Sequence, residues 1–376
     1  MDHNFNLGNK AYYFKSLQVL RAVALIMVYM FHQLLADEAF SRYGVCVFFI
    51  LSGFLNAYHG YGRKQDIGLY ASIKYGVTKV KRIFPLHIIM LTVAMALYIA
   101  SNWNAFCERM PSSILESLIR YVTNLFLISS WIPHVKILDV YLAEYNIATW
   151  FLSDCLLFYV CTPLIISLMQ RIYERRANRR YLPWIFIIII YIYVIVLNLI
   201  FVFKLGYIGA FWYIYSWPLS RIGDYLIGMH LGMIFLRKEI DKPDFYFMLL
   251  SFSIMLSVVI IYLCTLLDIP ENYIASSGFI FTVPVGGLVF ALAGLDSRLT
   301  LFFSRYRIAK SFLWLGAISP YAYLIQVPVI NAVHGVYERI GEVKMPIWCI
   351  ISVFITLVVA VVYRNWMEKR ERIRAK

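Results

Sequence analysis

Charged residues are scarce in this chain. Asp, Glu, Lys and Arg together make up 15% of the 376 residues, and only 21 residues are acidic. No charged linker or low-complexity tract separates one part of the sequence from another. An attached soluble domain would need a polar surface of its own, and no stretch supplies one. We therefore expect a single domain over residues 1–376.

Cysteine is also infrequent. The chain has six cysteines, none in a CxxC pair, and all but Cys107 fall in apolar stretches. Disulfide frameworks and cysteine-based metal sites usually show closely and regularly spaced cysteines. We therefore expect no disulfide framework, no metal site and no resident cofactor.

Apolar residues are abundant instead. They make up 61% of the chain, aromatic residues make up 17%, and the mean hydropathy is +0.70. Ten apolar windows are long enough to cross a bilayer as helices. They centre on residues 17–35, 43–60, 83–101, 149–170, 184–203, 212–236, 246–267, 276–295, 312–334 and 346–363. The sequence therefore predicts an all-α polytopic membrane protein with about ten transmembrane helices.

The stretch at 114–132 is expected to be an interfacial or re-entrant helix rather than an eleventh span. Glu116, Arg120 and Asn124 recur there every four residues and would form one polar stripe. With ten spans, most Lys and Arg residues fall in the loops of one side, which the positive-inside rule assigns to the cytoplasm. Both termini are then cytoplasmic, and residues 102–148 form the largest outer segment. An eleventh span would move the basic cluster at 175–180 outside.

The net charge of +14 raises the question of a nucleic-acid partner. The basic residues lie mainly in loops on one side of the predicted membrane, a distribution that topology and anionic lipid headgroups explain. We therefore expect membrane lipids as partners and no nucleic acid. Lys79, Lys81 and Arg82 directly precede a span at Pro85, where a cytosolic polyanion could also bind.

Two ionisable residues lie within the first apolar window. Arg21 and His32 are eleven residues apart, so on a helix they share one face and lie about 16 Å apart along the axis. Ionisable residues inside spans usually face a polar cavity or the bundle interior. The pair is our candidate reaction centre, although Arg21 could also snorkel to headgroups and His32 could serve as a helix-packing hydrogen-bond partner. A secondary transporter or flippase would also place such residues in the membrane, but no internal repeat supports one.

Several segments resemble the membrane-bound acyltransferase-3 family, and they occur in the family's order. The resembling segments are LRAVALIMVYMFH at 20–32, FFILSGF at 48–54, KVKRIFP at 79–85, SSWIP at 129–133, WFLSDCLLFYVCTPL at 150–164, PLSRIGDYLIGMHLG at 218–232 and GAISPYAYLIQVPV at 316–329. Each motif is weak alone, but the seven together cover most of the chain.

The resemblance implies an O-acetyltransferase of the bacterial inner membrane. Its donor would be cytosolic acetyl-CoA, and its acceptor a hydroxyl of a glycan or lipid-linked sugar, such as an O-antigen precursor. His32 would be the general base, or carry the acyl group, and Arg21 would guide the donor arm. Lys79 and Arg82 would bind the CoA phosphates. Ser52 and Gly53 would let the second helix approach closely enough to form a narrow passage, although helix packing alone is the simpler role.

The chain departs from the family pattern at several positions. Cys155 stands where the family usually has Glu, and Asp154 precedes it, displaced by about 100° around a helix. Asp154 and its neighbour Ser153 are therefore candidates for a substrate contact or a structural role. Arg221 and Asp224, three residues apart on one helix, are either a mutually neutralising pair or substrate contacts.

Overall fold

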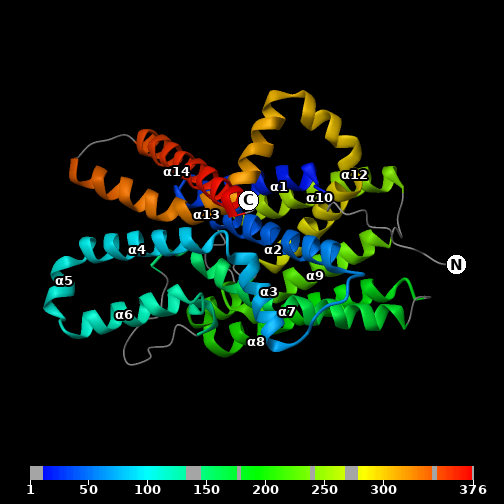
Figure 1. Ribbon diagram of the computed structural model, residues 1–376, viewed down its shortest axis with the longest axis horizontal. Helices are drawn as coiled ribbons and strands as arrows, with labels where there is room; N and C mark the ends of the chain where they lie inside the picture. Colours follow the sequence, from blue (N-terminus) through cyan, green and yellow to red (C-terminus); the bar gives the residue numbers. More distant parts are fainter. Residues whose placement is uncertain are drawn as a thin grey trace.

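The computed structural model describes residues 12–132, 145–175, 179–237, 242–266, 278–340 and 345–374, and this part of the chain is helical throughout apart from turns and short connections (Figure 1). Its ten long helices are α1 (Lys15–His32), α2 (Glu38–Gly60), α4 (Phe84–Ser101), α7 (Thr149–Glu174), α8 (Leu182–Tyr215), α9 (Pro218–Leu236), α10 (Pro243–Leu266), α12 (Thr282–Arg305), α13 (Arg307–Ile340) and α14 (Met345–Arg374). The shorter elements are α3 (Leu69–Val80), α5 (Trp103–Glu108), α6 (Ser112–Leu125) and the 3-10 turns η1 (Ser129–Trp131) and η2 (Phe279–Phe281).

The long helices correspond to the ten predicted apolar windows, and the prediction of an all-α polytopic membrane protein is confirmed. Among the described residues, eight helices are long and apolar enough to cross a membrane. The other two long helices are α1 and α9, whose apolar stretches are short. Helix α1 carries Arg21, and α9 carries Arg221 and Asp224. One boundary differs from the predicted window at 212–236. Helix α8 is kinked at Gly206, where φ is 66°, and its second part runs to Tyr215. The chain restarts at Pro218, because proline is well suited to a first helical turn.

Helix α2 packs against both α1 and α9 and is largely buried. Gly53 of α2 packs against α9 so closely that an added Cβ would lie 2.0 Å from the Tyr225 carbonyl oxygen. Gly228 of α9 faces the Ile50 carbonyl of α2 at the same distance. Small residues permit such backbone contact between membrane helices. The two glycines therefore allow α2 to cross α9 at close range.

Helix α6 runs alongside α4, to which α5 joins it (Figure 1). The polar stripe of α6 faces the protein: Arg120 and Asn124 are buried, and the Arg120 guanidinium lies over the rings of Tyr98 and Tyr145 at 4.7 and 4.3 Å. The opposite face is apolar, and Leu118 is 58% exposed. The placement of 114–132 in the membrane, interfacial or re-entrant, stays a prediction. Residues 133–144 of the predicted outer segment lie outside the described residues.

Candidate active site

Two adjoining cavities lie between the first three helices and α7. One has a volume of about 370 Å³ and the other about 570 Å³, and five residues line both of them. The shared residues are Arg21, Ser52, Lys79, Arg82 and Tyr159. The fold therefore brings four of the predicted site residues, from separate segments of the chain, to one place.

Arg21 enters this shared wall from the middle of α1. Its Nη1 donates a hydrogen bond to Gln18 Oε1 at 3.3 Å, one turn earlier on the same helix. Within the described part of the chain, Arg21 forms no ion pair with a carboxylate. A guanidinium has five N–H donors, so most of them remain for an anionic or carbonyl-bearing ligand.

Ser52 faces the shared wall from α2 and is joined there by a residue that sequence reasoning missed. The Ser52 hydroxyl lies 2.8 Å from the Tyr159 hydroxyl of α7. Tyr159 belongs to the WFLSDCLLFYVCTPL segment. The resemblance of this segment to the family indicated that the region is important, but not that Tyr159 lines the site. Gly53, the next residue of α2, points instead toward α9. The Ser52 and Tyr159 pair places two hydroxyl groups in the same shared wall as Arg21.

Lys79 and Arg82 reach the cavities from the end of α3 and the turn before α4. The Lys79 ammonium lies 5.0 Å from the centre of the Tyr75 ring. Lys79 keeps much of its own surface accessible, but the surrounding protein removes water from the ammonium, and this partial desolvation lowers the pKa of Lys79. Arg82 forms an ion pair with Glu371 of α14, and its carbonyl accepts a hydrogen bond from Tyr363 Oη at 3.0 Å.

The remaining wall of the smaller cavity is largely aromatic and apolar. It includes Phe48, Phe151, Tyr321, Tyr323 and Pro320. Tyr321, Tyr323 and Pro320 come from the GAISPYAYLIQVPV segment of α13. Cationic groups on one side and apolar groups on the other suit an elongated ligand with a charged end and a less polar arm.

His32 lies apart from these cavities, about 16 Å from Arg21 along α1. It is the last residue of the helix and is half-buried. The following residue, Gln33, is buried and donates a hydrogen bond to Ser352 of α14, while Leu34 has a φ of 60° and turns the chain away. His32 therefore lies at the opposite end of α1 from Lys15, beyond the two cavities that Arg21 lines.

Several of the residues that line these cavities lie in the segments that resemble the acyltransferase-3 family, among them Arg21, Ser52 and Lys79. A family model described as an acyltransferase domain, of the acyltransferase-3 type, matches residues 14–364. The chain belongs to the acyltransferase-3 family. Comparisons with curated proteins and with solved structures gave no match. The predicted family is thus confirmed over nearly the whole chain.

In this acyltransferase, the neighbouring residues Asp154 and Cys155 of α7 point in different directions. Cys155 lines the smaller cavity. Asp154 is fully buried and accepts a hydrogen bond from Ser130 Oγ at 2.7 Å, and Ser130 also bonds to Ser153 at 2.7 Å. The helical step of about 100° therefore places Asp154 against the SSWIP segment and leaves a thiol facing the cavity.

Arg221 and Asp224 lie deeper in the acyltransferase, on α9. Their side chains form an ion pair at 3.2 Å, and Thr282 Oγ1 donates a hydrogen bond to Asp224 at 2.7 Å. The Arg221 guanidinium also lies 5.2 Å from the centre of the Phe49 ring. Both side chains are almost completely buried, and neither lines the two cavities around Arg21. Mutual neutralisation explains how the pair is accommodated in the bundle.

Proposed function

We propose that this membrane acyltransferase transfers acetyl from acetyl-CoA to a hydroxyl of a cell-surface glycan or its lipid-linked precursor. The observation that carries the proposal is the convergence of Arg21, Lys79 and Arg82 on two adjoining cavities. The phosphates of CoA require positive charge, which these three side chains supply. The pantetheine arm and the acetyl group are less polar, and they suit the wall formed by Phe48, Tyr321 and Tyr323.

In this proposal acetyl-CoA is a substrate, and it enters from the cytoplasmic side. The basic residues at the end of α3 face that side if both termini are cytoplasmic in a bacterial inner membrane. Lys79 and Arg82 then bind the phosphates near the entrance, and the arm extends past Arg21. Ser52 and Tyr159 offer hydrogen bonds to the amide groups of the arm. The acceptor approaches from the opposite side of the membrane.

His32 acts as the general base in the proposed reaction, because a neutral imidazole can accept a proton from a hydroxyl group. Its imidazole takes the proton from the acceptor hydroxyl as the hydroxyl oxygen attacks the thioester carbonyl. The carbon–sulfur bond then breaks, and the CoA thiolate takes the proton from the imidazolium. The products are an acetyl ester and CoA. The position of His32 at the far end of α1 supports this role, because that end faces the acceptor side in the proposed topology.

Acetyl transfer by the purified protein tests this function. Labelled acetyl-CoA is supplied with a lipid-linked O-antigen precursor, and ester formation is compared between the wild type and His32→Ala. The matched control is His334→Ala, because His334 is half exposed on α13 and pairs with Glu338. We expect the first variant to lose at least about 100-fold in rate and the control to remain active. A folded His32→Ala protein with full activity would overturn the assignment of His32, and a wild type that transfers no acetyl to any glycan would overturn the function.

A further inference from the structure

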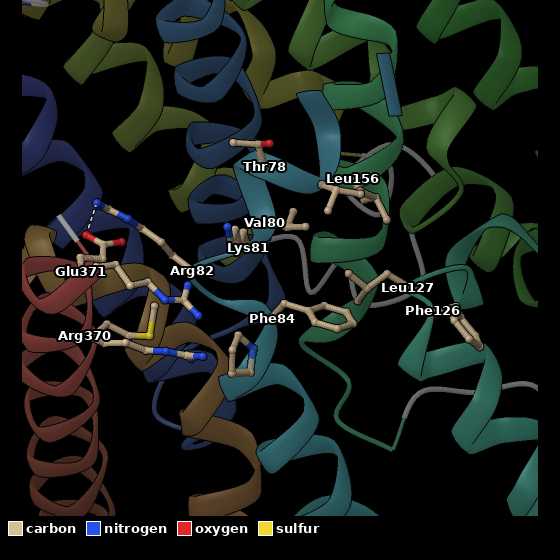
Figure 2. A pocket seen from close by; sticks show the side chains of 14 residues that line it. Thr78, Val80, Lys81, Arg82, Phe84, Phe126, Leu127, Leu156, Arg370 and Glu371 are labelled. Carbon is tan, nitrogen blue, oxygen red and sulfur yellow. Dashed lines mark hydrogen bonds and ion pairs between the residues drawn. The ribbon is translucent and has the colours of Figure 1, made fainter. Parts of the chain in front are cut away.

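A third cavity, about 790 Å³ in volume, lies on the other side of Arg82 (Figure 2). The turn between α3 and α4 forms its base, the last turns of α14 form one wall, and the end of α6 and α7 form the other. In Figure 2, Arg370 and Glu371 of α14 lie on one side and Phe126 and Leu127 on the other, with Phe84 between them. Of the residues that line this cavity, the proposed acetyl transfer uses only Arg82.

The polar part of the cavity is strongly basic. Lys81, Arg82, Arg370 and Arg374 line it together with a single acidic residue, Glu371. Glu371 pairs with Arg82, so the cavity keeps a surplus of three positive charges. Arg370 also lies 5.4 Å from the centre of the Trp366 ring, which orients its side chain. This arrangement favours a ligand that carries at least one phosphate or another strong anion.

The rest of the cavity is apolar and extends to the outer surface of the bundle. Val80, Phe84, Leu127 and Leu156 line its floor. At its rim, Phe126 is 61% exposed. A soluble anion would leave this aromatic side chain in contact with water. A ligand with hydrocarbon chains would instead cover it, and the burial of apolar surface would favour binding.

We propose that this cavity binds an anionic phospholipid. Its phosphate lies among Lys81, Arg370 and Arg374, and its acyl chains lie along Phe84 and Phe126. Basic pockets between membrane helices on the cytoplasmic side are suited to acidic headgroups. A bound lipid would hold the basic end of α14 against the turn before α4. Because Arg82 also lines both cavities of the candidate active site, the lipid would neighbour the donor-binding wall without belonging to it.

Lipid retention measured by native mass spectrometry tests the proposal. The purified full-length protein is titrated with phosphatidylglycerol or with phosphatidylcholine. The test variant carries both substitutions Arg370→Gln and Arg374→Gln. The matched control is Lys369→Gln with Arg372→Gln, which removes the same charge from exposed positions of the same helix that do not line the cavity. Both variants are checked for folding by size-exclusion chromatography.

We expect phosphatidylglycerol to bind the wild type more tightly than phosphatidylcholine does. The Arg370 and Arg374 variant should lose at least about tenfold in affinity for phosphatidylglycerol, and the control should stay within about twofold of the wild type. Equal losses in the two variants would overturn the proposal, because they would show an effect of overall charge alone. Displacement of phosphatidylglycerol by acetyl-CoA would also overturn it, because the cavity would then belong to the donor site. Neither outcome depends on whether the protein transfers acetyl.

Discussion

The hydroxyl of Ser52 on α2 lies 2.8 Å from the hydroxyl of Tyr159 on α7. Both residues, together with Arg21, line the wall that is common to the two cavities. The two residues are 107 positions apart in the sequence. Each hydroxyl can donate one hydrogen bond and accept others, so the pair can bond to a ligand while remaining bonded to each other. This bond links the helix that carries the FFILSGF segment to the helix that carries the WFLSDCLLFYVCTPL segment.

We expect Tyr159→Phe to weaken donor binding without unfolding the protein. The substitution keeps the ring and removes the hydroxyl, so one polar contact is lost, worth about 0.5–1.5 kcal/mol. The KM for acetyl-CoA should rise about threefold to tenfold, measured in the acetyl-transfer assay. Tyr193→Phe is the control, because the Tyr193 hydroxyl bonds to the Leu219 carbonyl on the exposed side of α8. An unchanged KM in Tyr159→Phe would remove the hydroxyl pair from the donor site.

We expect Gly53→Ala to destabilise the fold. The added methyl group would lie 2.0 Å from the Tyr225 carbonyl oxygen, so α2 and α9 would have to move apart. Overpacking of this kind typically costs about 1–3 kcal/mol, which a thermal-unfolding experiment in detergent detects. Gly335→Ala on α13 is the control, because no atom outside its own helix lies within 4 Å of the added Cβ. Gly335→Ala should be neutral or stabilising, since alanine favours a helix more than glycine does. Equal stability of the two variants would contradict the close crossing.

We expect donor affinity to fall at alkaline pH because of Lys79. Partial desolvation lowers the pKa of Lys79, so this ammonium loses its proton at a lower pH than an ordinary lysine does. Its attraction for the CoA phosphates is complete at a pH well below that lowered pKa and is lost as the pH rises through it. The Kd for CoA, measured by calorimetry between about pH 7 and 10, should therefore increase. Lys79→Arg should flatten this dependence, because a guanidinium stays charged over the whole range. Lys74→Arg, on the exposed side of the same helix, should leave it unchanged, and a flat wild-type profile would rule out Lys79 as a phosphate ligand.

We expect acetyl-CoA to protect Cys155 from alkylation. Cys155 lines the smaller cavity, whereas Cys161, two turns farther along α7, lines neither of the two cavities around Arg21. A small maleimide should therefore react with Cys155 more slowly when the donor is bound, by a factor of about five or more if the donor occupies most of the sites. The reaction is followed by peptide mass spectrometry, and Cys161 in the same sample provides the control. Protection of both thiols to the same degree would indicate a general change in the protein rather than occupancy of the cavity.

The proposed orientation predicts which engineered cysteines react from outside the cell. Arg180→Cys, in the connection between α7 and α8, should be protected from an impermeant maleimide in intact cells. Trp103→Cys, in the exposed α5, should react with it. The basis is the positive-inside distribution of Lys and Arg. Labelling of Arg180→Cys from outside would reverse the topology and with it the side from which the donor enters.

Much of the fold could be predicted from the sequence, because a bilayer sets the length and polarity of each spanning helix. The windows at 83–101 and 246–267 correspond closely to α4 and α10. The stretch at 114–132 was more difficult, because its periodicity identified the polar stripe of α6 but not the direction in which it faces. The structure turns Arg120 inward onto the rings of Tyr98 and Tyr145. Such a choice depends on neighbouring helices that periodicity does not specify.

The candidate site could be predicted only in part. Arg21 could be predicted because it is an ionisable residue in an apolar window. Ser52, Lys79 and Arg82 could be predicted because each lies in a segment that resembles the family, and the fold brings the four residues together. Tyr159 was missed, because a tyrosine in an apolar helix is more often a packing residue. Glu371 was missed as the partner of Arg82, because 289 residues separate them.

The sequence by itself determined that this protein is a helical membrane acyltransferase. Apolar run lengths specify the spans, and motifs in a fixed order specify the family. Only the tertiary structure decided which polar residues share a cavity. It joined Ser52 to Tyr159, directed Cys155 rather than Asp154 toward the smaller cavity around Arg21, and left His32 at the far end of α1. The physical reason is that a helix fixes the azimuth of its own residues, whereas the face that meets another helix depends on close packing between chain segments far apart in sequence.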